Sequence, residues 1–489
     1  MERLSVTMSD YGFGNGQDGF GTPTSAENVD LLNKALMAEH ITGRDTTNLT
    51  DASGAPLKVE SLEKTLKHLT FRQQDIVLWK DLPKKPAYNT VEEFNQQLSY
   101  GMDRGGFNAE GELPDEEDSI FVRRANYVKY LGVTKSVTHQ MTLVNTMVGP
   151  AIQKAVNDGT MWILRALNKA LYFGDERLNP LEFSGFLAQQ AQAYDTVSEY
   201  MDSDQIVDLR GSQLTEDAIE TGANTVVENF GLANMLYAPP AVLSNFVKNF
   251  YGNKFIMPNT PALTDGVMGQ HVQSFESQFG RIGLKHDIFF RKLPAKKATA
   301  DPTSQKAPNK PVWTGATVKT NVAGSKWASG DAGNVMYAVS AINRYGESDL
   351  AVISAAAAAV ANGAIDLQFT DGGGVYKATS YRIYRTFTNG TATSEFYPLF
   401  DVSKNDLTRG YDGGAPGYVR DMNRWLPDCD QAWMPQFDTE VLEFAQLAPL
   451  MKMDLAVLSP AFRFMVLLYG TPMLYAPKKM VRFVNIGRK

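Results

Sequence analysis

The chain has 489 residues, 43% hydrophobic and 21% charged, so it can bury a substantial core and is too long for one ordinary domain. Its formal net charge of -7 and the lack of a basic run argue against a protein that wraps nucleic acid tightly, although folding can still gather a local basic patch. The single cysteine, Cys429, excludes an intrachain disulfide and a CxxC zinc site, and this usage is typical of a protein folded in a reducing cytoplasm. The start has no apolar signal segment, and the apolar stretch 462–475 is too short to span a bilayer, so we expect no membrane segment.

Residues 1–70 predict an N-terminal arm. Helical patterns over 24–36 and 61–69 are separated by a loose polar stretch over 46–56. Short helices on polar linkers cannot build a core alone, so we expect them to lie on another surface.

Residues 71–146 predict one long two-stranded excursion. The segment 75–82 indicates a strand, 87–98 its extended continuation, and 121–144 a long β-rich return. Between them, 101–119 forms a charged tip with a cluster of carboxylates: Glu110, Glu112, Asp115, Glu116, Glu117 and Asp118. An isolated hairpin is only marginally stable, so it needs a neighbouring surface, such as another subunit.

The strongest helical pattern of the chain covers 147–173 and stops at Gly174, where a glycine commonly ends a helix. A short turn and strand are expected over 183–187. The elements expected next are a helix over 215–230, a strand over 234–238, a helix over 241–251 and a strand pair over 280–290.

The composition changes after this region. Residues 294–311 are rich in Lys, Ala, Pro and Thr and predict a linker, and 312–419 show short alternating strands typical of a β-sandwich of about 100 residues. From 437 the pattern returns to strands, over 463–469, 472–476 and 481–486. A sandwich flanked by linkers in a larger α+β chain indicates an inserted domain.

No motif in the sequence carries catalytic, cofactor or metal chemistry. Residues 14–19 match GxGxxG, but no buried strand precedes them, so a flexible arm is the better interpretation. The five histidines lack the spacing of a helical zinc pair, and neither a GxSxG elbow nor a phosphate-binding loop is present. Cys429 lies between Asp428 and Asp430, which disfavours a reactive thiolate.

The acidic tip has three interpretations. It lacks the ligand spacing of a calcium loop, so a solvated tip is preferred. The third is pairing with basic groups of a neighbouring subunit, which would set register more than affinity. The candidate contact residues are those six carboxylates with Lys84, Lys85, Arg123 and Arg124.

The order of these elements resembles the major capsid protein of tailed bacteriophages, the Hong Kong ninety-seven fold. Residues 75–89 resemble the entry into the family's E-loop, 127–137 its return, and 168–175 the end of its spine helix. Residues 183–186 and 470–487 resemble strands of its peripheral domain, and 279–290 a strand of its axial domain. The segments 337–348 and 381–385 resemble fibronectin type III or immunoglobulin-like modules of phage virion proteins.

The resemblance implies an α+β chain with six parts. They are an N-terminal arm (1–70), the E-loop with its flanking strands (71–146), the spine helix and peripheral domain (147–190), the axial domain (191–300), an all-β immunoglobulin-like insertion (307–420), and the axial-domain return with closing peripheral-domain strands (421–489).

The resemblance also implies a function: a structural subunit, not an enzyme, that assembles as pentamers and hexamers into an icosahedral shell around DNA. It implies folding in the host cytoplasm, a place in the virion capsid and contact with packaged DNA without sequence-specific binding. A portal protein and scaffolding or decoration proteins are its expected partners. Some relatives lose an N-terminal segment to a protease, which the presence of Met1 argues against here, and a few crosslink through an E-loop lysine, for which Lys84 and Lys85 have no identifiable acceptor.

Three alternatives remain at this stage. One is a tail or baseplate component, which often has the same β-sandwich. Another is a carbohydrate-active enzyme with an accessory module, although no paired carboxylates support it. The third concerns only 312–419. This segment could bind host-surface glycans, whereas the other interpretation is a spacer or a contact between capsomers.

Overall fold

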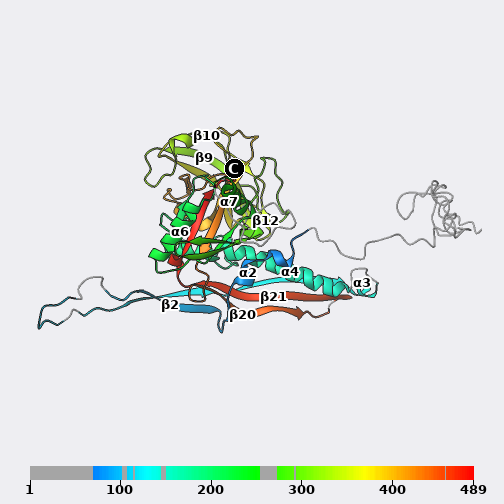
Figure 1. The fold of residues 1–489 in the computed structure, drawn as a ribbon. Coiled ribbons are helices and arrows are strands. Elements are labelled where there is room, and N and C mark those ends of the chain that lie inside the picture. Colours follow the sequence, from blue (N-terminus) through cyan, green and yellow to red (C-terminus); the bar gives the residue numbers. More distant parts are fainter. Residues whose placement is uncertain are drawn as a thin grey trace, which may run out of the picture. The chain divides into compact units, whose positions relative to one another are not determined.

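A computed structural model describes residues 70–101, 107–113, 116–144, 150–253, 272–290, 293–457 and 459–488, with the side chains of 250–253 left out. The N-terminal arm expected over 1–70 therefore lies outside the described residues, apart from its last position. The described chain contains helices together with runs of consecutive strands, as expected of an α+β chain (Figure 1).

The described chain begins with two short helical turns, η4 (Gln73–Asp75) and α2 (Leu78–Asp81), so the strand expected over 75–82 is wrong. Leu78 and Leu82 are buried against the helix α4 (Ala151–Phe173), and Trp79 N donates to Asn168 Oδ1 at 3.1 Å. A spacing of four residues brings two apolar side chains to one side of a helical turn, and so short an apolar run does not by itself distinguish turn from strand.

The long excursion is present. Strand β2 (Val91–Ser99) pairs antiparallel with β3 (Ile120–Tyr127), from Val91 opposite Tyr127 to Ser99 opposite Ile120. Strand β4 (Lys129–Thr138) follows, but the expected strand does not continue to 144, because 139–143 form the short helix α3 (His139–Leu143). The pairing of β4 with its neighbour β21 ends at Thr138, so the backbone beyond it has no strand partner there.

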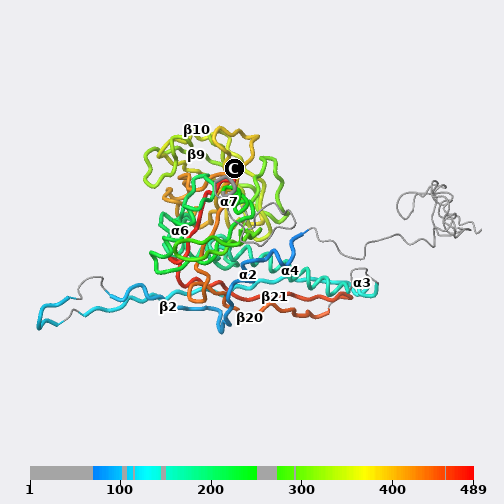
Figure 2. Tube along the Cα trace, in the orientation of Figure 1, coloured from blue at the N-terminus to red at the C-terminus, as the bar shows by residue number. Residues whose placement is uncertain are grey.

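A four-stranded sheet in the order β1-β20-β21-β4 lies beside this excursion. It contains β1 (Lys84–Pro86), β20 (Leu442–Asp454) and β21 (Ala461–Leu474), and Figure 2 traces β20 and β21 side by side. The two strands expected over 463–469 and 472–476 are one, since β21 runs through Pro472. The carbonyl of Pro472 accepts from Asn126 and Gln189 and not from β20, so its missing N–H faces the side without a strand.

Helix α4 (Ala151–Phe173) confirms the strongest helical prediction, and it packs along the four-stranded sheet (Figure 1). Its buried face includes Ile163, Leu167 and Leu171. Gly159 lets the helix approach the sheet, because a Cβ there would lie 3.1 Å from Val466 Cγ2. Gly174 ends the helix with φ -59°, so it serves close packing against the Ala170 and Phe183 carbonyls and not the left-handed conformation expected of such a glycine.

A buried carboxyl group ties α4 to the end of strand β8. Asp287 accepts hydrogen bonds from Asn168 Nδ2 at 2.8 Å and from the Tyr172 hydroxyl at 3.1 Å. Burial raises the pKa of Asp287, although these hydrogen bonds favour its charged form. The fully buried cluster therefore fixes the rotation of α4 about its axis.

The turn and strand expected over 183–187 are wrong, because 186–193 form the helix α5 (Phe186–Ala193). The Phe186 ring stacks on Trp433 with ring centroids 5.4 Å apart, and Leu187 and Ala191 are buried beside it. All six positions from 186 to 191 are buried, so their burial shows no helical spacing from which the sequence could have revealed the helix.

A second sheet of six strands has the order β5-β22-β19-β6-β8-β7. Its strands are β5 (Ile206–Asp208), β6 (Met235–Ala238), β7 (Ser274–Ser277), β8 (Gly280–His286), β19 (Asp430–Pro435) and β22 (Met480–Ile486). The helices α6 (Glu216–Glu228) and α7 (Pro240–Asn253) share a buried core with it, and Thr215 caps α6 by accepting from Ala218 N at 3.3 Å. These confirm the expected helices and strand. The pair expected within 280–290 instead joins β8 to the preceding β7, and 288–290 form the turn η5 (Ile288–Phe290).

Residues 312–421 form short strands, as expected, after a segment 293–311 with only the isolated bridge between Lys296 and Phe396. One sheet joins β11 (Tyr337–Asn343), β12 (Gly346–Glu347), β13 (Ala351–Val352), β16 (Ser380–Arg385) and β17 (Tyr397–Ser403). A second joins β9 (Val312–Lys319), β15 (Ala364–Thr370) and β18 (Tyr418–Asp421), and β10 (Gly333–Val335) pairs with β14 (Ala357–Ala359). The helix α8 (Lys404–Arg409) and two turns, η6 (Ser329–Asp331) and η7 (Pro477–Lys479), complete the described elements.

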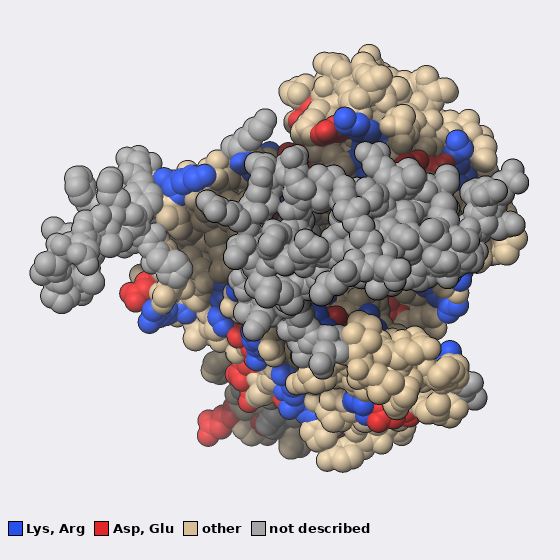
Figure 3. Space-filling view, turned by 90° about the vertical axis from the view of Figure 1, so that its right-hand side faces the viewer, with Lys and Arg blue, Asp and Glu red and all other residues tan. Residues whose placement is uncertain are grey.

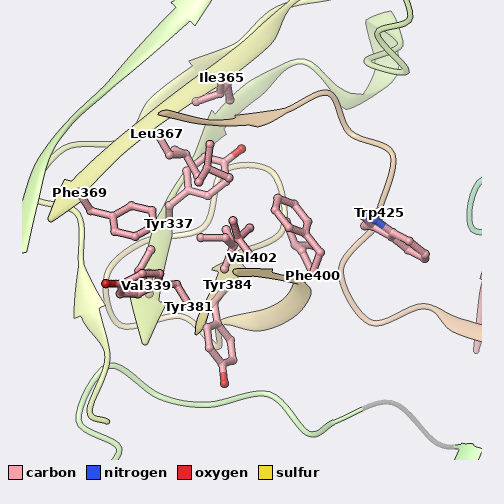
Figure 4. Packing of buried hydrophobic residues seen from close by; sticks show 14 of the residues in the cluster. Tyr337, Val339, Ile365, Leu367, Phe369, Tyr381, Tyr384, Phe400, Val402 and Trp425 are labelled. Carbon is pink, nitrogen blue, oxygen red and sulfur yellow. The ribbon is translucent and has the colours of Figure 1, made fainter. Parts of the chain in front are cut away.

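The core of this β region is shared by both of its larger sheets, and Figure 4 shows Val339 and Val402 of one with Leu367 of the other. The same cluster also contains Tyr200, Trp425 and Val484, which lie outside 312–421. The β region therefore completes its core with side chains from the rest of the chain.

Candidate assembly surfaces

The β2–β3 hairpin is anchored at its base to the end of β21. The Phe94 ring lies edge-on to Tyr475 with centroids 5.0 Å apart, and Gln96 Nε2 donates to the Tyr475 carbonyl. Asn126 Nδ2 donates to Gln189 Oε1 and to the Pro472 carbonyl, both at 3.1 Å. Alternate residues of both strands make these contacts, so one face of the hairpin base is fixed by the subunit itself.

The outer half of the hairpin exposes large apolar side chains. Tyr100 is 88% exposed, Leu113 91%, and Phe107 is fully exposed. Figure 1 shows the hairpin extending beyond the ends of the four-stranded sheet. Three large apolar side chains this exposed on one hairpin make its outer half a candidate contact surface.

The structure places the predicted acidic cluster on this same outer half. Five of its members are described, and all are exposed: Glu110, Glu112, Glu116, Glu117 and Asp118. Asp115 lies outside the described residues. The tip therefore combines exposed carboxylates with exposed apolar groups.

The four basic candidates lie nearer the root of the hairpin, where each has a partner in the same chain. Lys84 Nζ lies 4.4 Å from the centroid of the Trp79 ring, and burial lowers its pKa. Arg123 pairs with Glu93 at 3.4 Å, and Arg124 Nε donates to Gln96 Oε1 at 2.8 Å.

Lys85 pairs with Glu92 at 3.6 Å and lies over the Tyr475 ring. Burial alone would lower the pKa of Lys85, but the Tyr475 hydroxyl and Glu92 outweigh it and raise the pKa. Sequence reasoning thus found the charged residues of the hairpin but not that their basic members have partners within the subunit.

The face of the four-stranded sheet opposite α4 is a surface that sequence reasoning missed. Tyr130 of the edge strand β4 is 60% exposed and lies edge-on to Tyr469 of β21, with centroids 4.8 Å apart. Met451 and Met453 of β20 are also exposed. The available signal was the alternation along 129–138, in which Leu131 and Val133 face the core and Tyr130 does not.

On the face drawn in Figure 3, the described Lys and Arg residues lie interspersed with Asp and Glu. Several buried charged groups are paired with an opposite charge, as in Arg385 with Asp421 at 2.6 Å. Such a pair is a part of the packed interior and does not by itself indicate a reactive site.

No group of three or more His, Cys, Asp or Glu side chains that could hold a metal ion occurs among the described residues. Cys429, expected to be inert, is buried. In the described part of the chain, no helix is both long and apolar enough to cross a membrane.

A cavity of about 460 Å³ lies between the end of α4 and the strands β16 and β17. Lys169 lines it, and burial together with the nearby Arg382 lowers the pKa of Lys169. Glu182 lines the same cavity, and burial raises its pKa.

Comparisons with known proteins point in one direction. A family model described as the SU10 major capsid protein matches residues 32–304, more than half of the chain. The "Major capsid protein" of Staphylococcus phage K is 24% identical over 462 residues, covering 94% of this chain and 96% of the relative. The "Putative major capsid protein" of Enterococcus phage phiEF24C is 25% identical over 458 residues, covering 91% and 93%.

Solved structures similar to this chain include the capsid of a native GTA particle, with a TM-score of 0.46, 8% identity and coverage of 90% of this chain and 99% of that one. Another is the SrpI encapsulin complex of Synechococcus elongatus, with a TM-score of 0.40, 9% identity and coverage of 89% and 94%. The family match confirms the resemblance inferred from the sequence and favours a capsid protein over a tail component. The chain belongs to the SU10 major capsid protein family.

Proposed function

We propose that this chain is a structural, non-catalytic subunit that assembles as pentamers and hexamers into the icosahedral shell of a tailed phage and encloses its DNA. The observation that carries the proposal is the family match over residues 32–304. Repeated contacts between identical subunits are multiplied by symmetry, so no single contact has to be strong.

The β2–β3 hairpin is the proposed connecting element between subunits. Its base is fixed by Phe94, Gln96 and Asn126, while its outer half exposes Tyr100, Phe107 and Leu113. A two-stranded hairpin is marginally stable without further packing, and a neighbouring subunit supplies such packing. The exposed sheet face around Tyr130 and Met453 is an apolar surface of suitable character to receive it.

The ten charged residues predicted from the sequence divide into two groups within this proposal. The six acidic ones, Glu110, Glu112, Asp115, Glu116, Glu117 and Asp118, are the proposed contacts to a neighbour. The basic ones, Lys84, Lys85, Arg123 and Arg124, chiefly hold the root of the hairpin, because their observed partners lie in the same chain. Acidic groups at the rim of a contact fix orientation more than affinity.

We also propose that residues 307–420 are an immunoglobulin-like insertion, and that the other five parts keep the boundaries given by the family resemblance. Two sheets that share one core support the insertion. The insertion is a spacer or a contact between capsomers. A portal protein, scaffolding or decoration proteins and packaged DNA are the proposed partners, and folding takes place in the host cytoplasm before incorporation into the virion.

The first test is electron microscopy with sedimentation of the full chain expressed alone, compared with a variant that lacks 101–119. The full chain is expected to form closed shells or five- and six-fold capsomers. The variant is expected to remain a folded, soluble subunit that forms no closed shells, because its own core does not use the tip.

A finer variant removes only the exposed apolar groups of the tip, Phe107→Ser with Leu113→Ser. Its control is Val375→Ser, which removes an apolar side chain 90% exposed in the β region. The subunit concentration needed for shell formation should rise at least about tenfold for the tip variant, which corresponds to about 1.4 kcal/mol of contact free energy lost per subunit. Normal shells from both tip variants would refute the role of the tip while leaving the family intact.

A further inference from the structure

Helix α6 ends in a conformation that does not suit its sequence. The Phe230 N–H donates to the Val227 carbonyl and the Gly231 N–H to the Val226 carbonyl, both at 2.9 Å. This double closure places Phe230 in the left-handed region, at φ +60°. Glycine or asparagine commonly occupies that position, and a bulky aromatic residue there is an outlier.

The side chain of the strained residue contributes almost nothing to its own subunit. The Phe230 side chain is 92% exposed, so its ring packs on little of the described chain. Strained backbone persists where another requirement maintains it, commonly at functional sites. Stability of the isolated subunit does not supply that requirement here.

Two further apolar side chains, one of them two residues along the chain from Phe230, are also exposed. Leu232 is 50% exposed and Phe279 36%. They are close to one another, because Leu232 Cδ1 lies 3.7 Å from the position that a Cβ on Gly280, the residue after Phe279, would take. Phe230, Leu232 and Phe279 are called the Phe230 patch below.

The Phe230 patch has groups of opposite charge at its border. The Lys479 stem lies beside Gly231, with Cγ 3.1 Å from the position of a Cβ there. In the turn between β7 and β8, Gln278 N donates to Glu220 Oε1 at 3.1 Å. Opposite charges at the border of one patch suit a head-to-tail contact, in which the basic border of one copy meets the acidic border of the next.

We infer that the Phe230 patch binds a second copy of this chain in the assembled shell. The inference rests on the proposed function, since a shell subunit is surrounded by copies of itself. It adds a contact outside the β2–β3 hairpin, at the edge of the six-stranded sheet formed by β7. The strain at Phe230 is tolerated because it presents the ring to the neighbouring copy.

The test uses two variants, Phe230→Asn and Phe230→Gly. For each of them the inference predicts opposite effects on subunit stability and on assembly. Both residues accept the left-handed conformation, so the unfolding midpoint of the unassembled subunit should stay level or rise by about 1–3 °C. Assembly should weaken, with the subunit concentration at which half of the chain sediments as particles or capsomers rising at least about tenfold. A residue with only a structural role would not combine an unchanged or higher unfolding midpoint with weaker assembly.

Asn321→Gly is the matched control, because Asn321 is also exposed with positive φ, at +54°, but lies in the β region. It should leave both measurements near the wild-type values. Leu232→Ser should weaken assembly in the same direction as the Phe230 variants.

A direct readout places the photo-crosslinking residue benzoylphenylalanine at position 230 in the full chain. Illumination of assembled particles should give covalent dimers linked through 230, whereas the same residue at Phe387 should give few. If the wild type assembles and both Phe230 variants assemble equally well, this inference is overturned but the proposed self-assembly is not. A wild-type chain that stays monomeric at every concentration would overturn the proposed self-assembly and this inference with it.

Discussion

Charged residues inside the β region are held in place by specific partners. Arg385 and Asp421 are almost fully buried and lie 2.6 Å apart, and the Tyr337 hydroxyl donates to the same Asp421 oxygen at 2.7 Å. Removing one member of such a pair leaves an uncompensated charge, which typically costs about 3–5 kcal/mol. The pair therefore makes the β region depend on the strand β18 that carries Asp421.

Asp412 gives the region a predictable dependence on pH. Burial raises its pKa to about 6, and this outweighs the opposing effect of Arg424, which lies 3.2 Å away. Because the pKa is higher in the folded than in the unfolded chain, the contribution of Asp412 to stability is fully present below about pH 4 and is lost as the pH rises through about 6. The loss amounts to about 3 kcal/mol.

Comparison with Asp412→Asn isolates this effect, since asparagine also accepts the positive φ of +53° at this position. Between pH 7 and pH 4.5 the unfolding free energy of the wild type should rise relative to the variant, measured by denaturant titration at both pH values. A difference that does not change with pH, or changes in the opposite direction, would contradict the assignment.

Sequence alone identified the residue types of the hairpin but not their partners. Lys85 pairs with Glu92, which is nearby in the chain. Asn126 and Gln189 instead donate hydrogen bonds to the carbonyl of Pro472, which is distant in the chain. Such distant partners come from sheet pairing, which composition and periodicity do not reveal. The strained conformation of Phe230 was equally hidden, because only the backbone of the folded α6 shows it.

At the scale of elements, prediction succeeded where a pattern was long. Helix α4 has 23 residues and was identified from its apolar spacing, as were α6 and the short strands of the β region. It failed at α2 and α5, which have 4 and 8 residues and bury most of their apolar side chains. A short apolar run fits a strand and a buried helix equally, and tertiary packing decides between them.

The packing of α4 on the four-stranded sheet yields an element-scale prediction. Leu167 is fully buried in the shared core, so Leu167→Ala should reduce the unfolding free energy of the subunit by about 2–5 kcal/mol. Trp162 lies on the same helix but is 46% exposed, so Trp162→Ala should cost clearly less despite removing a larger side chain. Chemical denaturation of both variants makes the comparison, and an equal cost would mean that α4 packs differently.

At the scale of the whole molecule, the β region is joined to its surroundings by more than its two chain connections. Arg210 bridges to it, with Nη2 2.8 Å from Asp331 Oδ2 and a second hydrogen bond to the Lys326 carbonyl at 2.7 Å. Tyr200 packs edge-on against Trp425 with centroids 5.8 Å apart, and both belong to the core of the β region. A β region held this way keeps a fixed orientation in its subunit.

These contacts predict that the segment 307–420 does not fold well when it is cut out of the chain. It ends one residue before Asp421 and so leaves Arg385 buried without its partner, and it also lacks Trp425, Tyr200 and Val484. A longer fragment, 294–426, restores Asp421 and Trp425 and should show a clearly higher unfolding midpoint by circular dichroism and well-dispersed amide signals by NMR. In the full chain, Tyr200→Ala should destabilise the β region by about 3–5 kcal/mol through the loss of a buried aromatic side chain. A 307–420 fragment as stable as the longer one would show that this segment folds independently of the rest of the chain and that its orientation is set by its linkers alone.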